Sequence, residues 1–385
     1  MSVSAAPPAA ELVETAPIET TLDTPGQRTC ADIWLEMIAA ARSSIDLGQF
    51  YASNQQPSRL EPIVEALEAA VARGVRVRFL AEKSFVKVYP DTLDRLASAG
   101  AKIRHFDLRS APGGRGVLHA KYFIVDDRDA FFGSQNFDWR ALEHNYELGM
   151  RVRSPAFVAG LAAIFAADWA RAGGEPVDST DGANGAARRG IDHPAAAAHD
   201  PITLVASPRD LGPPGVPWDL PRIIELLDSA TTTITVQALG YRADADGGPW
   251  LELEAPLLRA AARGVSVRLL FADWAKRPRS IAGLQKLARI PHIEVRLTTI
   301  PVWSGGFIPF ARVTHGKALV VDGKRAWLGT SNWEKDYFYN SRNVGAIIDE
   351  PTLAGALAAR FAAVWQSPYA IPVDPDAAYS PPRIE

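Results

Sequence analysis

The chain contains a single cysteine, Cys30, among its 385 residues. An internal disulfide and a multi-cysteine metal cage are therefore excluded. No apolar run approaches the roughly 18 residues that a transmembrane helix needs, and the start of the chain lacks the basic and apolar regions of a secretory signal. The net charge of −3 argues against a general nucleic-acid coat, although it allows a small basic site. These absences indicate a cytoplasmic protein without a membrane span.

What the chain does have is an internal repeat. Each copy reads as an amphipathic helix followed by an alternating strand, then a helix that ends in Arg-Gly and a strand that follows at once. The matching segments are 33–52 with 223–242, 64–82 with 255–273, and 93–107 with 284–298. Strands alternating with helices predict an α/β fold. We expect two pseudo-symmetric α/β/α sandwich halves that share one central cleft.

The repeat also predicts the domain boundaries. The first half is expected over residues 11–172 and the second over 202–372. Between them, 173–201 is rich in Gly, Ala, Asp and Pro and has no hydrophobic periodicity, so we interpret it as a flexible linker.

Each half carries the same polar motif. Lysine follows histidine by two positions and aspartate follows it by seven; a hydroxyl residue and an asparagine come 15 and 17 positions after the histidine. The first copy comprises His119, Lys121, Asp126, Ser134 and Asn136, and the second His315, Lys317, Asp322, Thr330 and Asn332. Two such sets at equivalent places in a repeat are very unlikely to arise by chance.

The spacing has a structural meaning. Residues i and i+2 of a strand share a face, so each histidine and its lysine point the same way. Asp126 and Asp322 have the opposite parity and lie beside turns, so we expect them to be structural. Ser134, Asn136, Thr330 and Asn332 are expected to bind phosphate beside the lysines.

This residue set suits phosphodiester cleavage. Two facing imidazoles can act as nucleophile and general acid, with a covalent phosphohistidine between the two steps. Lysine and amide donors would stabilise charge on the phosphoryl oxygens. A zinc site is disfavoured because a lysine accompanies each histidine, so no metal and no other cofactor is expected. A non-catalytic scaffold is disfavoured because both motifs are intact.

The halves differ 28 residues after each histidine. Glu147 occupies that position in the first half and Asn343 in the second. A carboxylate behind an imidazole stabilises its charged or phosphorylated form, whereas an amide only orients it. The hypothesis is that His119, backed by Glu147, is the nucleophile, and that His315 is the general acid and later the base.

These motifs resemble the phospholipase D superfamily, whose enzymes carry twin H-x-K-x₄-D motifs, over about residues 11–370. Residues 116–149 and 308–338 are similar to the animal lysosomal phospholipase-D-like proteins and their poxvirus envelope relatives. The resemblance implies a metal-independent 5′-exonuclease on single-stranded DNA or RNA. It assigns the catalytic set to His119, Lys121, Asn136, Glu147, His315, Lys317 and Asn332.

The substrate class stays open at this point. Aromatic residues near the motifs could stack on bases: Phe50, Tyr51, Trp303, Phe307, Phe310, Trp333, Tyr337 and Phe338. The same side chains could accept the acyl chains of a phospholipid, and a phospholipase D or transphosphatidylase is the alternative. Because one chain carries both motifs, a monomer is expected to suffice, although a dimer is not excluded.

Overall fold

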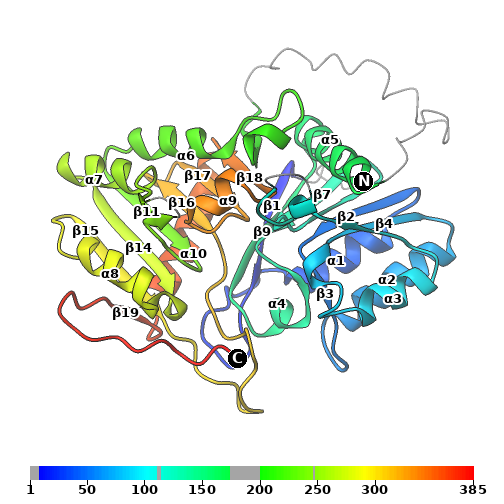
Figure 1. The fold of residues 1–385 in the computed structure, drawn as a ribbon, viewed down its shortest axis with the longest axis horizontal. Coiled ribbons are helices and arrows are strands. Elements are labelled where there is room, and N and C mark those ends of the chain that lie inside the picture. Colours follow the sequence, from blue (N-terminus) through cyan, green and yellow to red (C-terminus); the bar gives the residue numbers. More distant parts are fainter. Residues whose placement is uncertain (1–7, 111–113, 174–199, 246–247) are drawn as a thin grey trace, which may run out of the picture.

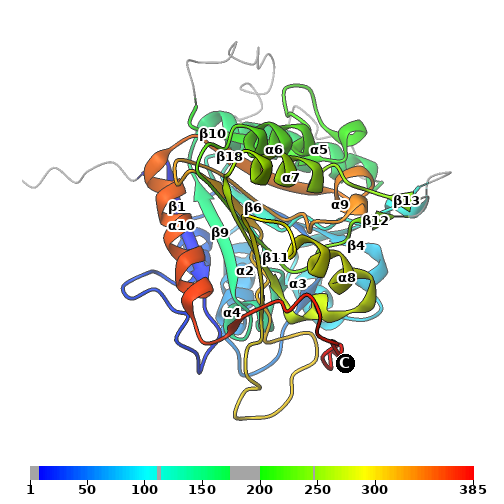
Figure 2. The same ribbon diagram turned by 90° about the vertical axis from the view of Figure 1, so that its left-hand side faces the viewer.

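The computed structural model describes residues 8–110, 114–173, 200–245 and 248–385. Within them, two large sheets lie side by side with helices on their faces (Figures 1 and 2). The predicted linker, 173–201, falls outside the described residues except at its ends. No helix in the described ranges is both long enough and apolar enough to cross a bilayer.

The first sheet has seven strands and belongs to the first repeat. In order across the sheet they are β1 (Ala10–Thr15), β9 (Glu147–Val152), β7 (Asp129–Gly133), β6 (Tyr122–Val125), β2 (Ser44–Gln49), β4 (Arg76–Glu82) and β5 (Lys102–Phe106). The strands β2, β4 and β5 run parallel, and the rest of the sheet is antiparallel.

The second sheet repeats this order and adds one edge strand. Its strands are β10 (Ile202–Ser207), β18 (Asn343–Ile348), β17 (Arg325–Gly329), β16 (Ala318–Val321), β11 (Thr233–Ala238), β14 (Ser266–Ala272), β15 (Ile293–Thr298) and β19 (Ala370–Pro372). Two small ladders complete the described strands: β3 (Ala52–Ser53) with β8 (Phe137–Asp138), and β12 (Asp244–Ala245) with β13 (Gly248–Pro249). The shared strand order confirms the predicted pair of α/β halves.

Alternation along the strands divides the apolar side chains between three cores. The outer face of the first sheet packs on α1 (Cys30–Ala39), α2 (Glu61–Ala72) and α3 (Asp91–Ser98). The outer face of the second packs on α6 (Asp219–Asp228), α7 (Glu254–Ala262) and α8 (Pro278–Leu287). The inner faces share one continuous core with α5 (Pro155–Arg171) and α10 (Pro351–Gln366). The short helices α4 (Trp139–Glu143) and α9 (Lys335–Tyr339) precede β9 and β18.

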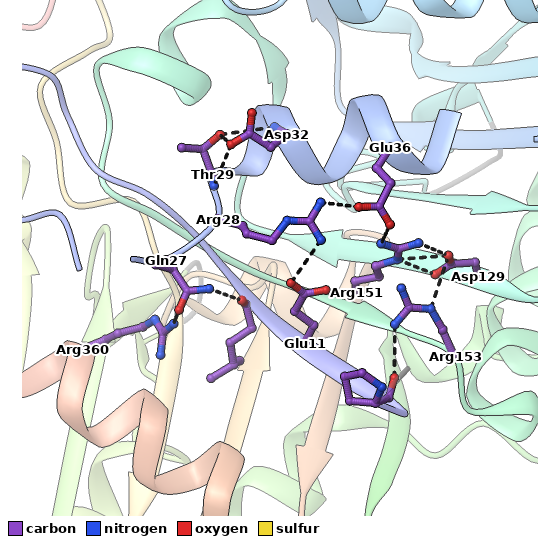
Figure 3. Close-up of polar contacts among 12 residues, drawn as sticks. Glu11, Gln27, Arg28, Thr29, Asp32, Glu36, Asp129, Arg151, Arg153 and Arg360 are labelled. Carbon is purple, nitrogen blue, oxygen red and sulfur yellow. Dashed lines mark hydrogen bonds and ion pairs between the residues drawn. The ribbon is translucent and has the colours of Figure 1, made fainter. Parts of the chain in front are cut away.

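Hydrogen bonds and ion pairs fix α1 against its sheet. A capping box starts the helix: the Asp32 amide donates to the Thr29 hydroxyl (3.2 Å), and the Thr29 amide donates to the Asp32 carboxylate (3.3 Å). Arg151 on β9 lies between Glu36 on α1 (2.7 Å) and Asp129 on β7 (2.6 Å), as Figure 3 shows. The strand that begins with Glu147 is therefore held along its outer face.

Helix α10 of the second half is also anchored to the first half. Arg360, which is 7% exposed, lies 3.3 Å from the Glu14 carboxylate on β1. Its guanidinium also donates to the side-chain oxygen of Gln27 (Figure 3). With the shared inner core, these contacts make the two halves one body.

Candidate active site

The two motifs meet where the halves exchange backbone hydrogen bonds. The His119 amide donates to the Arg342 carbonyl at 2.9 Å, and the His315 amide donates to the Tyr146 carbonyl at 2.8 Å. The first motif therefore lies beside the start of β18 in the second half, and the second motif lies beside the start of β9 in the first half. Both histidines are nearly buried, at 5% and 7% exposed, which limits access of water to the site.

His315 is paired with a carboxylate. Its Nδ1 lies 2.8 and 3.0 Å from the two oxygens of Glu147, a side chain that is fully buried. Burial raises the pKa of Glu147 to about 8. Burial and the charges of Lys317 and Lys121 lower the pKa of His315 itself well below its ordinary value. The proton that the pair keeps through neutral pH therefore resides on Glu147, which faces Nδ1, and the imidazole carries its own hydrogen on Nε2, from where it can be delivered.

His119 is paired with an amide whose orientation is determined by its neighbours. The Asn343 side-chain nitrogen donates to the carbonyls of Tyr337 (2.8 Å) and Ser341 (3.3 Å). Its oxygen therefore faces Nδ1 of His119 at 2.9 Å, and that nitrogen must carry the hydrogen. Burial, with the nearby charge of Lys121, lowers the pKa of His119 well below its ordinary value. The ring is thus neutral, with a free lone pair on Nε2.

These contacts correct the sequence analysis, which placed Glu147 behind His119 and Asn343 behind His315. The partners are exchanged because β9 and β18 begin at the boundary between the halves. There, parallel bridges join 118 with 342 and 146 with 314. Each side chain that starts the strand therefore reaches the histidine of the other repeat.

The two hydroxyl residues also have a different place from the one expected. Ser134 donates to the Glu147 carboxylate at 2.5 Å, and Thr330 donates to the Asn343 side-chain oxygen at 2.8 Å. Both residues are fully buried. The assignment of Ser134 and Thr330 to phosphate is therefore wrong. Each hydroxyl points toward the first residue of the next strand. Ser134 and Thr330 thus position Glu147 and Asn343, the two side chains that contact the histidines.

The lysines are fully buried between the two motifs. Each ammonium donates to the carbonyl of its own motif histidine, Lys121 to His119 and Lys317 to His315. Burial lowers the pKa of Lys121 well below its usual value and that of Lys317 to about 7. An anionic phosphate between them would restore the charge of both, so the site is suited to binding a phosphodiester.

The two motif asparagines lie beside the lysine strands. Asn332 is 3% exposed, and Asn136 donates from its side-chain nitrogen to the Tyr51 hydroxyl at 3.3 Å. The side-chain oxygen of each has no hydrogen-bond partner within the described part of the chain. The predicted phosphate contact of these two amides therefore stays a prediction.

The motif aspartates face away from the histidines. Asp126 accepts hydrogen bonds from the amides of residues 42–44, and Asp322 accepts from those of 231–233. These segments lead into β2 and β11. Both aspartates have positive φ angles, 52° and 53°, so each closes a turn and holds the start of the neighbouring strand.

Sequence reasoning missed one ion pair that supports the site. Arg342 and Asp168 are both fully buried and joined by two hydrogen bonds of 2.7 and 2.9 Å. The sequence does contain a sign of this pair, because the charged Asp168 lies four residues after Ile164 and three after Phe165, on the apolar face of α5.

Among the described residues, no group of three or more His, Cys, Asp or Glu side chains is arranged to hold a metal ion.

Known proteins are similar to this chain over most of its length. A family model described as "Cardiolipin synthase, PLD-like domain" matches the chain twice, at residues 34–169 and 223–365. "Phospholipase D Z" of Dictyostelium discoideum is 31% identical over 89% of this chain and 86% of its own length. "5'-3' exonuclease PLD4" of Mus musculus is 30% identical over 91% of this chain and 76% of its own length.

A solved structure shares the fold. The phosphatidylserine synthase of Haemophilus influenzae Rd KW20 superimposes with a TM-score of 0.63 at 13% identity, over 89% of this chain and 85% of that one. At that identity the likeness concerns architecture alone. The family model matches both halves and the similar relatives span most of the chain, so this chain belongs to the phospholipase D-like family and is a phosphodiester-cleaving enzyme of it.

Proposed function

We propose that the protein is a 5′-exonuclease on single-stranded DNA or RNA that works through a covalent phosphohistidine on His119. The observation that carries the mechanism is the unequal preparation of the two imidazoles. Asn343 orients His119 (2.9 Å) while burial and the charge of Lys121 keep that ring neutral, and His315 is paired with Glu147 (2.8 Å). One ring is therefore prepared for attack and the other for proton transfer.

The reaction proceeds in two steps. Nε2 of His119 attacks phosphorus as the P–O bond to the leaving nucleoside breaks, and His315 gives its Nε2 proton to the leaving oxygen. Water then attacks the phosphohistidine, and His315 takes the water proton as the P–N bond breaks. Lys121 and Lys317 neutralise the charge on the phosphoryl oxygens in both steps.

Nucleic acid is favoured by the relatives' names. Two similar proteins, PLD4 of Mus musculus and PLD3 of Rattus norvegicus, are both named 5'-3' exonucleases; the second covers 96% of this chain at 30% identity. The second candidate is a phospholipid headgroup, which the name of "Phospholipase D Z" favours. Val302 and Phe310, 63% and 41% exposed on the loop before His315, would suit a lipid surface.

One chain supplies the whole site in this proposal. The Glu147–His315 and Asn343–His119 pairs both join the two halves of the same chain. A second copy is therefore not needed for the chemistry, and a monomer is expected to be active. The proposal also includes a cytoplasmic location, since the single cysteine, Cys30, is buried and no disulfide is involved.

The test uses purified protein, EDTA and a 3′-labelled single-stranded oligonucleotide with a 5′-hydroxyl. We expect progressive shortening from the 5′ end, without added metal and with no activity in a His119→Ala variant. Cleavage that EDTA abolishes would contradict the metal-independent mechanism. If the same preparation releases headgroup from a phospholipid and leaves the oligonucleotide intact, the lipid candidate replaces this one.

The pairing of His315 with Glu147 predicts a particular pH profile. His119 must be neutral, and its pKa is lowered, so the acidic limb should lie below the ordinary histidine value. The acid pair must be protonated, and with the pKa of Glu147 raised to about 8 the alkaline limb should lie near that pH. Glu147→Gln removes the carboxyl that holds the proton of the pair, and the pKa of His315 alone is lowered by burial and by Lys317 and Lys121. We expect the alkaline limb to move to lower pH, with kcat at pH 7 reduced roughly 10²-fold.

A second buried carboxylate provides the control for this profile. Burial also raises the pKa of Asp219, to about 7, but Asp219 accepts hydrogen bonds from Ser207 and Ser331, and in the described part of the chain none joins it to a motif histidine. Asp219→Asn should leave the alkaline limb where it is. An unchanged limb in Glu147→Gln, measured as log kcat against pH, would show that His315 does not depend on this carboxylate.

A further inference from the structure

Four aromatic rings form a continuous surface that leads outward from His119. We call Phe50, Tyr51, Phe85 and Tyr89 the aromatic wall. The rings of Tyr51, Phe85 and Tyr89 are stacked, with interplanar angles of 0–30° and centroids 5.1–6.2 Å apart. Phe50 meets Phe85 edge to face at 4.6 Å. All four are only partly buried, so they present aromatic surface to a ligand.

The wall is connected to the catalytic groups. The ring of Phe50 lies 5.0 Å from the imidazole of His119, and the Lys121 ammonium lies 4.9 Å from the same phenyl centroid. The hydroxyl of Tyr51 accepts a hydrogen bond from Asn136. A group bound against the wall would therefore lie next to a phosphate held between the lysines.

The wall occurs in the first half only. Gly48 pairs with Tyr122, three residues after His119, and Gln237 pairs with Ala318, three residues after His315. Gly48 and Gln237 are therefore equivalent positions in the two halves. On that register, and on the matching one for β4 and β14, the wall positions correspond to Leu239, Gly240, Ala275 and Arg279. Trp274 lies one position earlier, but its ring partner is Phe310 at 6.4 Å. In the part of the chain that the structure describes, no aromatic ring packs on His315.

We propose that the aromatic wall is a stacking subsite for the base of the 5′-terminal nucleotide, the one that stays bonded to phosphorus when His119 attacks. This inference rests on the proposed exonuclease activity and deepens it. The wall lies on the nucleophile's side, while the leaving strand departs on the side of His315. Every base has a face that stacks on an aromatic ring, so the wall suits the base that lies nearest to the nucleophile.

The chemistry of the wall favours a planar base over an acyl chain. Two of its four rings are tyrosines, whose hydroxyls are held by Asn136 and, at 3.4 Å, by Arg140. Leucine in place of a ring keeps an apolar surface and removes only the flat face. Phe85→Leu and Tyr89→Leu therefore separate stacking from general apolar contact.

The experiment compares three oligothymidylates with a 5′-hydroxyl: one intact, one abasic at the first nucleotide and one abasic at the second. For the intact strand, we expect Phe85→Leu to lower kcat/KM by roughly 5- to 100-fold, with a similar effect of Tyr89→Leu. The strand abasic at its first nucleotide should be cleaved equally by variant and wild type. The control is Tyr339→Leu, which removes a 37% exposed tyrosine whose hydroxyl contacts Glu252; it should have no effect on either strand.

The outcomes separate this inference from the function on which it rests. If wild type shortens the intact strand and the leucine variants match it, the subsite is refuted while the exonuclease stands. If the variants are sensitive to the second base rather than the first, the placement of the terminal nucleotide is refuted. If wild type cleaves no oligonucleotide, and Phe85→Leu alters the acyl-chain preference on phospholipid vesicles, both proposals fall. Equal thermal unfolding temperatures for the variants and wild type would exclude a folding defect.

Discussion

A His315→Ala protein mixed with thymidine 3′-(4-nitrophenyl phosphate) should release one equivalent of nitrophenol and then stop, with the nucleotide bound to His119. Nitrophenolate leaves without needing a proton, so the missing acid does not prevent the first step. The second step needs His315 to take a proton from water, and without it turnover should fall by about 10²- to 10⁴-fold. The covalent product should be found on the peptide that contains residue 119.

The site geometry makes this order directional. Asn343 fixes the hydrogen of His119 on Nδ1 and leaves Nε2 free, whereas Glu147 holds a proton against Nδ1 of His315 and leaves the hydrogen of that ring on Nε2. His119→Ala should therefore give neither burst nor label. His105→Ala is the matched control, because that histidine lies on β5, outside the site, and it should turn over normally. Label on residue 315 in the His119→Ala protein would reverse the assignment.

The fold could be predicted from the sequence because both copies of the repeat show clear helix and strand periodicity. Helix and strand periodicities recur in the same order in both halves, and the two sheets share one strand order. The parity of each motif also predicted which side chains share a face. His119 and Lys121 lie inside the site, and Asp126 lies at a turn on its other side.

The partners of the histidines could not be predicted in the same way. Glu147 and Asn343 are each 28 residues from a histidine along the chain, but the contacts that form span 168 and 224 residues. Local pattern gives no information about which half a strand end faces at a pseudo-twofold boundary. Phe85 and Tyr89 were missed for a related reason: they lie in and after the short 3₁₀ turn that follows β4, where no periodicity marks a functional surface.

The ion pair between Arg342 and Asp168 should be the most sensitive point of the boundary between the halves. Arg342→Met leaves the carboxylate of Asp168 buried without its cation, and the free energy of unfolding should fall by about 3–5 kcal/mol. The lost guanidinium also donates to the carbonyls of Ser207 (3.0 Å) and Leu211 (2.6 Å), which would be left without that donor. Urea denaturation followed by tryptophan fluorescence measures the change.

Two further variants show whether burial is the cause. Arg325 forms an ion pair with Asp349 in which both side chains are over 40% exposed; Arg325→Met should cost less than about 1 kcal/mol. Replacing both buried partners, as Arg342→Met with Asp168→Leu, should recover much of the loss, because no unpaired charge remains in the core. A single Arg342→Met variant as stable as Arg325→Met would contradict this account.

Recovery of stability in the double variant would show that the main role of this ion pair is to fix how the two halves meet, and that its net contribution to stability is small. The backbone of Arg342 holds the His119 amide, so the alignment of the nucleophile depends on the same contact.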